Sequence, residues 1–238
     1  MSSGSFVVAI DGHAGSGKST VSRMLAKALG WMHIDTGAMY RAITLKALKL
    51  GLPLDDERAL TDIALSTKIE FVTSSTGEQR ILVDGEDVTE EIRSPEVETA
   101  VSYVSAIRGV RRALQAMQRE LVKGRCAVAE GRDMQTVVFP DAQLKVFLTA
   151  SLEERARRRY LELKAKGYDV SFEDVLKQTQ ERDRLDSTRD DSPLIPAEDA
   201  IIIDTTHMSP EEVVQQILSA LRQRTEGDES NTACGFKQ

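Results

Sequence analysis

Residues 12–19 are Gly12-His13-Ala14-Gly15-Ser16-Gly17-Lys18-Ser19, which match the pattern G-x-x-x-x-G-K-[ST] at every fixed position. A β-branched run at residues 6–10 precedes this loop, and apolar residues with helical spacing follow it up to Gly30. Glycines let successive backbone N–H groups turn toward an anion, and the following helix adds the partial positive charge of its N-terminus. The sequence therefore predicts nucleoside triphosphate binding, with a glycine turn that binds no ligand as the alternative.

Two side chains of the loop are predicted to bind the phosphates and the metal ion directly. Lys18 provides a positive charge for the outer phosphates, and the hydroxyl of Ser19 provides a ligand for Mg²⁺. We expect ATP and Mg²⁺ to bind here, through Gly12, His13, Ala14, Gly15, Ser16, Gly17, Lys18, Ser19 and Thr20.

Composition excludes several classes of protein. The chain has 238 residues, of which 41% are hydrophobic and 29% charged, so neither wholesale disorder nor a membrane protein is indicated. The net charge of -7 disfavours a sequence-independent nucleic-acid partner. The first apolar run ends at Asp11 and is too short for a secretory signal. We expect a cytoplasmic monomer whose partners are small molecules, without membrane or nucleic-acid binding.

Five short apolar runs predict an α/β fold with a parallel sheet flanked by helices. They lie at residues 6–11, 32–35, 126–130, 144–148 and 200–204. About ninety residues separate the second run from the third, which implies an inserted lobe. Within it, residues 68–73 and 80–83 are predicted strands of a small antiparallel sheet, joined by a turn at residues 74–77.

A predicted helical pair at residues 151–166 and 171–186 carries many arginines, at positions 155, 157, 158, 159, 182, 184 and 189. Such arginines usually form a solvated face, and that interpretation stays open. Phosphoryl transfer, however, needs several cations around the moving group, so the pair is also predicted to close as a lid over ATP. The polar residues 225–238 are predicted to form a flexible tail.

The sequence lacks a well-placed histidine to act as a general base, and this limits the classes of phosphoryl acceptor. His13, His33 and His207 have no paired spacing to other ligands or bases, and we expect none of them to have a chemical role. A nucleoside monophosphate, whose second pKa lies near 6, needs no such base. Asp35 or Asp133 remains an alternative base for a hydroxyl acceptor.

Several longer motifs closely resemble bacterial cytidylate kinase, the nucleoside monophosphate kinase that phosphorylates CMP and dCMP with ATP. The motifs are residues 12–19, 35–41 (DTGAMYR), 88–97 (VTEEIRSPEV), 130–142 (EGRDMQTVVFPDA) and 182–189. The resemblance implies a P-loop kinase core at residues 1–35 and 105–224 with a five-stranded parallel sheet. It also implies a nucleoside-monophosphate-binding insert at residues 36–104, containing the antiparallel sheet, and a lid at about 151–189.

The resemblance also implies roles for individual residues. Together with Lys18 of the phosphate loop and Arg158 of the predicted lid, Arg132 and Asp133 are the expected catalytic residues, and the predicted lid also adds Arg157 to the ATP site. The phosphate of CMP would be bound by Arg41 and Arg132, the cytosine edge by Ser102, Arg111, Asp133 and Arg189, and the sugar by Arg182 and Asp186; Thr36 and Tyr40 complete the substrate site. Gln135 departs from the family pattern, which has glycine there, and Thr36 replaces serine while keeping the hydroxyl.

Other functions fit less well. The nearest alternative is a kinase of UMP, dTMP or shikimate on the same core. A GTP-driven switch needs an Asn-Lys-x-Asp motif, but Asn231 is the only asparagine in the chain. A nucleic-acid-binding module built on the arginine helices conflicts with the acidic net charge.

Overall fold

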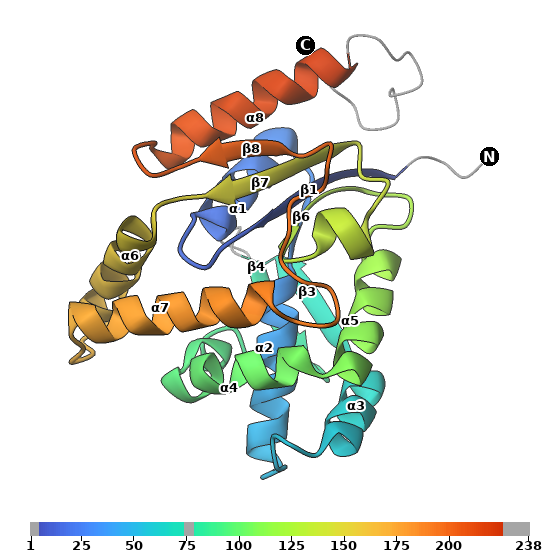
Figure 1. Ribbon diagram of the computed structural model, residues 1–238. Coiled ribbons are helices and arrows are strands. Elements are labelled where there is room, and N and C mark those ends of the chain that lie inside the picture. Colours follow the sequence, from blue (N-terminus) through green and yellow to red (C-terminus); the bar gives the residue numbers. More distant parts are fainter. Residues whose placement is uncertain (1–4, 74–78, 226–238) are drawn as a thin grey trace. The chain divides into compact units, whose positions relative to one another are not determined.

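The computed structural model describes residues 5–73 and 79–225 (Figure 1). The chain divides into two compact units, one made of the residues up to His33 with those from Val122 onward, the other running from Ile34 to Leu121. The predicted turn at residues 74–77 lies outside the described residues. So does the predicted tail, except for Thr225, which ends the last helix.

A five-stranded sheet forms the centre of the first unit, in the order β2-β6-β1-β7-β8. Its strands are β1 (Phe6–Gly12), β2 (Met32–Asp35), β6 (Cys126–Gly131), β7 (Leu144–Thr149) and β8 (Ile201–Asp204). Strand β1 pairs in parallel with both β6 and β7, and β7 pairs in parallel with β8. The predicted parallel sheet is confirmed, and its five apolar runs match the five strands.

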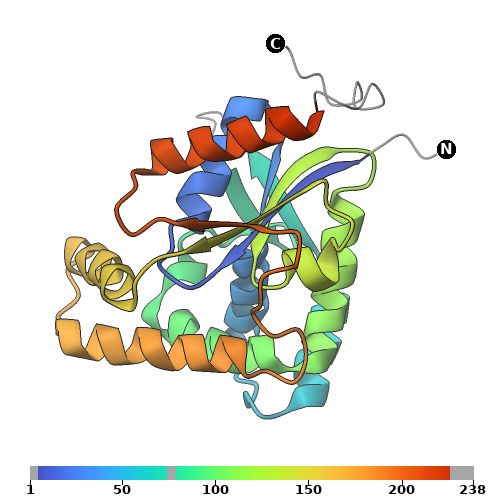
Figure 2. The ribbon, with the colours of Figure 1, turned by 45° about the horizontal axis from the view of Figure 1, so that its top comes forward.

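Helices α1 (Lys18–Leu29) and α8 (Pro210–Thr225) cover one face of this sheet. Because side chains alternate along a strand, Phe6, Val8 and Ile10 of β1 point to this face and share one apolar cluster with both helices. The two helices contact each other, as the second view shows (Figure 2). The alternation sends Asp11 to the opposite face, toward a π-helical turn, η2 (Met134–Val138).

Helices α6 (Leu152–Ala165) and α7 (Phe172–Ser187) form the predicted helical pair. They contact each other, and in both views α6 lies beside the N-terminal part of α7 (Figures 1 and 2). Ser151 and Ser171 cap their N-termini by accepting hydrogen bonds from backbone N–H groups three residues later. Capping explains why both helices begin where the serines stand in the sequence.

The second unit combines a three-stranded antiparallel sheet with helices. Its elements are α2 (Thr36–Lys49), α3 (Glu57–Ser66), β3 (Ile69–Thr73), β4 (Gln79–Val83), β5 (Glu86–Asp87), η1 (Glu91–Arg93), α4 (Pro95–Ala106) and α5 (Arg108–Leu121). Met39 and Ile43 of α2 are fully buried in its apolar core. The predicted small antiparallel sheet is confirmed, with β5 as an additional strand.

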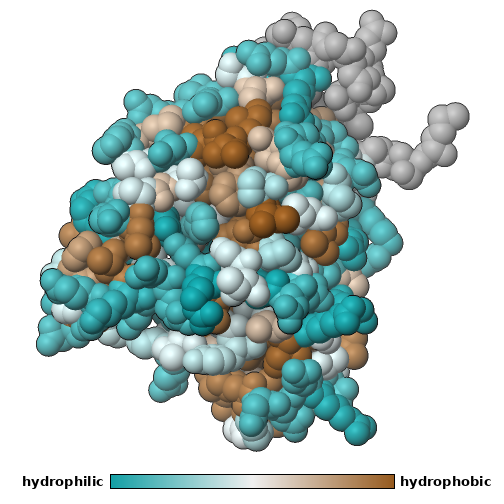
Figure 3. Space-filling model, in the orientation of Figure 1, coloured by the Kyte–Doolittle hydropathy of each residue, from teal (hydrophilic) through white to brown (hydrophobic). Residues whose placement is uncertain are grey.

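Polar side chains cover most of the face shown in Figure 3, with apolar patches beside α6 and along β8. Leu161 of α6 and Ile202 of the edge strand β8 are 51% and 60% exposed. Among the described residues, no helix combines the length and the apolar character needed to cross a bilayer.

Candidate active site

The loop between β1 and α1 adopts a backbone that requires its glycines. Gly12, Gly15 and Gly17 have φ angles of 149°, 77° and 89°, which L-residues rarely adopt. A side chain at Gly12 would place its Cβ 2.0 Å from the carbonyl oxygen of Leu148. Gly17 immediately precedes α1, so the loop delivers its backbone N–H groups at the positive end of that helix.

Lys18 is buried within this loop. Its Nζ donates to the carbonyl oxygen of His13 at 2.6 Å and contacts Ser16 Oγ at 3.4 Å. Burial lowers the pKa of Lys18 well below its usual value, and the nearby charge of Arg132 lowers it further. The ammonium group is therefore held where an anion would relieve its electrostatic cost.

Ser19 contacts a carboxylate on the neighbouring strand. Its hydroxyl donates to Glu130 Oε2 at 2.7 Å, and the other carboxylate oxygen lies 3.0 Å from His33 Nε2. A hydroxyl beside a carboxylate is the kind of hard oxygen pair that Mg²⁺ prefers. Among the residues that the structure describes, no group of three or more His, Cys, Asp or Glu side chains could hold a metal ion. The chemistry of the Ser19 hydroxyl, an oxygen ligand beside a carboxylate, fits Mg²⁺.

Asp11 fixes the turn that follows β6. Its two carboxylate oxygens accept the backbone N–H groups of Met134 at 3.0 Å and Gln135 at 2.8 Å. Burial raises the pKa of Asp11 to about 7, against the lowering effect of these two hydrogen bonds. The amide side chain of Gln135 donates to Val146 O at 2.6 Å and accepts from Ala197 N at 3.2 Å. The glycine expected at position 135 is thus not required, because the larger side chain is buried with both ends satisfied.

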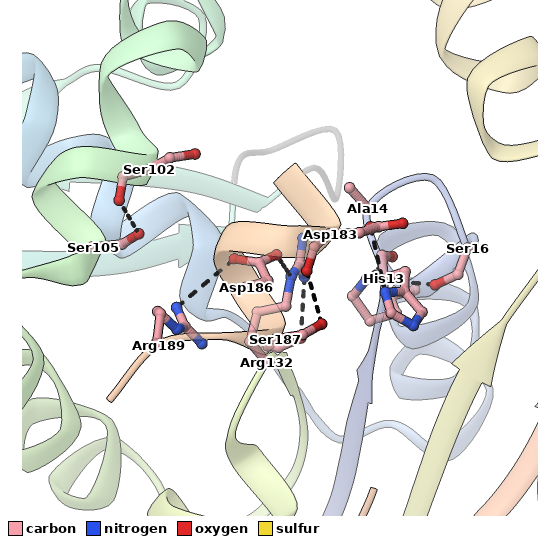
Figure 4. Close-up of polar contacts among 12 residues, drawn as sticks. His13, Ala14, Ser16, Ser102, Ser105, Arg132, Asp183, Asp186, Ser187 and Arg189 are labelled. Carbon is pink, nitrogen blue, oxygen red and sulfur yellow. Dashed lines mark hydrogen bonds and ion pairs between the residues drawn. The ribbon is translucent and has the colours of Figure 1, made fainter. Parts of the chain in front are cut away.

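Arg132, Asp186 and Arg189 point toward one another (Figure 4). Arg132 Nε donates to Asp186 Oδ2 at 2.8 Å, and Arg189 Nη1 lies 3.8 Å from Asp186 Oδ1. Burial raises the pKa of Asp186, but the charges of Arg132 and Arg182 outweigh it, so the net pKa is lowered. Asp133 is 2% exposed at the start of the η2 turn. Arg132, Asp133, Arg182, Asp186 and Arg189 therefore belong to one charged part of the first unit.

A second charged cluster joins the phosphate-binding loop to helices α6 and α7. Arg155 of α6 is buried and binds Asp183 of α7 through two hydrogen bonds, of 2.9 and 2.6 Å. The same guanidinium donates to Ala14 O at 3.2 Å, and His13 Nδ1 lies 3.3 Å from Asp183 Oδ1 (Figure 4). The base of the predicted lid is thereby anchored to the loop.

The two predicted ATP-binding arginines of α6 lie in different surroundings. Arg158 donates to Thr205 O at 2.6 Å and reaches the carbonyl oxygen of Gly15 at 3.4 Å, so it lies directly at the loop. Arg157 is 58% exposed and binds Glu154, three residues earlier on the same helix. Of these two arginines, Arg158 is the one already placed beside the phosphate-binding loop.

The remaining predicted substrate residues lie in the second unit. Arg41 Nε binds Glu98 Oε1 at 2.7 Å, and Thr36 begins α2 behind the capping residue Asp35. Arg111 is almost fully buried, with its guanidinium 5.5 Å from the centre of the Tyr40 ring. Its Nη1 donates to Ser105 O at 3.1 Å, and the Ser105 hydroxyl donates to Ser102 O at 3.2 Å (Figure 4). Arg111, Tyr40 and Ser102 are thus neighbours within this unit.

Comparison with known proteins identifies the family. The family model for cytidylate kinase matches residues 8–223, which is nearly the whole chain. The chain belongs to the cytidylate kinase family. Cytidylate kinase of Caldanaerobacter subterraneus subsp. tengcongensis is 53% identical over 221 residues, covering 93% of this chain and 96% of that protein. The Bacillus velezensis cytidylate kinase is 50% identical over 218 residues, covering 92% and 97%.

Comparison of structures supports the fold alone. An uncharacterized protein from Eubacterium ventriosum is 11% identical, with a TM-score of 0.50, and the match covers 92% of this chain and 99% of that one. Identity this low carries no information on substrate.

Sequence reasoning missed several polar residues of this cytidylate kinase family member. Glu130, Asp11 and Arg155 were not among the predicted site residues, and His33 was expected to have no role. Glu130 stands at the carboxyl end of a buried strand, where ligands of parallel sheets commonly bind, and that position was an available indication. Arg155 and Asp183 are 28 residues apart, and no local pattern indicates such a pair.

Proposed function

We propose that this chain transfers the γ-phosphoryl group of ATP to CMP or dCMP, giving CDP or dCDP and ADP. The observation that carries this proposal is the match to cytidylate kinases at about half of all positions over nearly their full length. The glycine-dependent backbone of the phosphate-binding loop supports it independently, because that conformation presents N–H groups suited to a polyphosphate.

The ATP site proposed here is the loop from Gly12 to Thr20 with Arg157 and Arg158. Backbone N–H groups bind the phosphates, while Lys18 and Arg158 neutralise charge that develops on the transferred group. Arg157 would have to leave Glu154 to reach ATP. We assign Mg²⁺ to the Ser19 hydroxyl, where a bound ion would neutralise negative charge on the phosphates.

The proposed acceptor site takes CMP through three sets of side chains. Arg41 and Arg132 bind the phosphate, since a planar guanidinium suits bidentate contacts with phosphate oxygens. Contacts to the sugar are assigned to Arg182 and Asp186. The cytosine is assigned to Ser102, Arg111, Asp133 and Arg189, with Thr36 and Tyr40 completing the site.

Cytosine recognition follows from complementary hydrogen bonding. Cytosine has an exocyclic amine that donates, and a ring nitrogen and a carbonyl oxygen that accept. A carboxylate such as Asp133 suits the amine, whereas arginines suit the two acceptors. Uracil reverses donor and acceptor at two of these atoms, which leaves buried groups unpaired at a cost of about 1 to 3 kcal/mol.

The proposed transfer needs no covalent intermediate on the protein. A phosphate oxygen of CMP attacks the γ-phosphorus in line, the bond to the β-phosphate oxygen breaks, and ADP leaves. The monophosphate is already largely ionised at neutral pH, so no general base has to remove a proton. The chain's contribution is alignment and positive charge, from Lys18, Arg132 and Arg158 in particular, with Asp133 orienting the acceptor.

Three further features are proposed with this function. Closure of residues 151–189 would exclude water and so prevent hydrolysis of ATP. A monomer that works in the cytoplasm, where both nucleotides are available, is consistent with an activity that needs only small molecules.

An acceptor panel tests the proposal. Purified protein is mixed with ATP, Mg²⁺ and each of CMP, dCMP, UMP, dTMP and shikimate, and products are identified by ³¹P NMR. We expect CMP and dCMP to be converted fastest. Equal rates with CMP and UMP would contradict the assigned cytosine contacts, and conversion of shikimate alone would overturn the proposed function.

A further inference from the structure

His33, at the centre of β2, contacts a residue that in turn contacts the proposed metal ligand. Its Nε2 lies 3.0 Å from Glu130 Oε1, and Glu130 Oε2 accepts the Ser19 hydroxyl at 2.7 Å. The His33 and Glu130 side chains are only 12% and 4% exposed. A strand, its neighbouring strand and the first turn of α1 are thus connected through one carboxylate.

The chemistry of the carboxylate fixes the direction of these hydrogen bonds. An ionised carboxylate can only accept, so the hydrogen of the His33 contact lies on Nε2. With one oxygen held by His33 and the other by Ser19, the plane of the carboxylate is fixed. Because the Ser19 hydroxyl donates its hydrogen to Glu130, the lone pairs of its oxygen point elsewhere and are available to a cation.

We propose that His33 is a positioning residue for the metal site, acting through Glu130 to orient the Ser19 hydroxyl. The inference rests on the proposed function, since that function supplies the nucleotide-bound Mg²⁺. His33 itself contacts the carboxylate rather than the ion. Partners of metal ligands typically change metal affinity by about 10- to 100-fold when they are replaced.

A linkage measurement tests this role without relying on turnover. The Kd of a nonhydrolysable ATP analogue is measured by calorimetry with and without Mg²⁺. The metal-free Kd divided by the Kd with Mg²⁺ reports how strongly metal binding is coupled to nucleotide binding. In His33→Leu we expect the ratio to fall about tenfold relative to wild type while the metal-free Kd stays unchanged. A general disturbance of the loop would instead weaken both.

His33→Gln is the matched control, because its side-chain amide keeps an N–H donor. We expect this variant to retain the wild-type ratio within about threefold, which is small beside the roughly 10- to 100-fold effect of removing a partner of a metal ligand. A wild-type ratio in His33→Leu, or equal losses in the leucine and glutamine variants, would overturn the proposal.

A second measurement on the unmodified protein covers the case in which His33→Leu does not fold. Nitrogen-15 NMR distinguishes the two tautomers of a neutral imidazole, and we expect His33 to carry its hydrogen on Nε2. A hydrogen on Nδ1 alone would overturn the proposal. Failure of the proposed function is distinguishable, because a wild-type protein that binds the analogue with Mg²⁺ but never phosphorylates CMP leaves the linkage result intact.

Discussion

Two arginine–carboxylate pairs of helices α6 and α7 have hydrogen bonds of the same lengths but differ in their exposure to water. Arg155 and Asp183 join α6 to α7 with hydrogen bonds of 2.9 and 2.6 Å, and their side chains are 6% and 18% exposed. Arg184 and Glu181 lie one turn apart on α7, with hydrogen bonds of 2.9 and 2.6 Å and exposures of 61% and 54%. The comparison shows that contact geometry alone does not determine what a pair contributes.

Access of water explains why the two pairs should contribute differently to stability. At the surface, water solvates either partner once the other is removed, so an exposed pair contributes about 0 to 1 kcal/mol. In the interior, removing one partner leaves the other charge without compensation, and the cost rises to several kcal/mol. The buried pair also connects elements far apart in sequence, because Arg155 reaches the phosphate-binding loop as well.

Replacing Asp183 with alanine should therefore have the largest effect on stability. The change leaves the buried Arg155 guanidinium without its carboxylate, and we expect the free energy of unfolding in urea to fall by about 3 kcal/mol. Asp183→Asn, which keeps one acceptor oxygen, should lose less. A loss below about 1 kcal/mol for the alanine variant would mean that the Arg155–Asp183 pair contributes no more to stability than an exposed ion pair does.

Lys18→Ala extends the comparison to a buried cation whose ammonium group donates to the backbone carbonyl of His13. We expect turnover to fall about 10³-fold, because a charge assigned to the transferred group is removed from a buried position in the phosphate-binding loop. Stability should not fall with it, since burial already disfavours the charged lysine. Lys27→Ala, an exposed position on the same helix, is the control, and near-normal activity of the Lys18 variant would contradict the assigned role.

Asp133→Ala tests a buried carboxylate that is assigned to the substrate rather than to structure. If Asp133 accepts a hydrogen bond from the cytosine amine, kcat/KM should fall about 10- to 100-fold more for CMP than for UMP. Both substrates are assayed with saturating ATP. Equal losses on CMP and UMP would mean that Asp133 acts on the shared part of the nucleotide.

The pKa values of the buried Asp11 and the half-buried Asp183 should be shifted in opposite directions. Burial raises the pKa of Asp11 to about 7, while for Asp183 the contacts with His13 and Arg155 outweigh burial and lower the pKa. Carbon-13 NMR of the carboxyl groups measures both midpoints. A midpoint for Asp11 near that of an ordinary carboxyl would show that its two backbone hydrogen bonds dominate over burial.

The signs of the two stability effects follow from these shifts. Asp11 holds its proton longer in the folded than in the unfolded state, so its contribution is lost as pH rises toward 7, by up to about 1.4 kcal/mol per pH unit. Asp183 contributes stability above its unfolded pKa, and this is lost as pH falls through its lower folded value. Lowering the pH should therefore weaken the Arg155–Asp183 pair and restore the stability that Asp11 contributes.

Much of the fold could be predicted from local patterns. Short apolar runs located all five parallel strands, and the helical pair predicted at residues 151–166 and 171–186 agrees closely with the observed bounds of α6 and α7. These features depend on neighbouring residues alone. The short strand β5 was missed because its two residues, Glu86 and Asp87, are exposed and carry no alternation.

The candidate site was less accessible to such reasoning. The phosphate-binding loop is a contiguous motif, and its glycine conformations follow from the sequence. The contacts of Glu130 with Ser19 and His33 depend on which strands are neighbours, and β2 and β6 are almost a hundred residues apart. The arginines of α6 and α7 also looked alike in sequence, although burial separates Arg155 from Arg157.

Arg184→Ala should have the smallest effect and completes the comparison. Its partner Glu181 stays solvated after the change, and alanine favours the helix at least as well as arginine, so we expect the free energy of unfolding to change by less than about 0.5 kcal/mol. Activity with CMP should stay at the wild-type level. Because the hydrogen bonds of this pair match those of Arg155 in length, a loss as large as that of Asp183→Ala would show that hydrogen-bond length, rather than exposure to water, determines the strength of the ion pairs of α6 and α7.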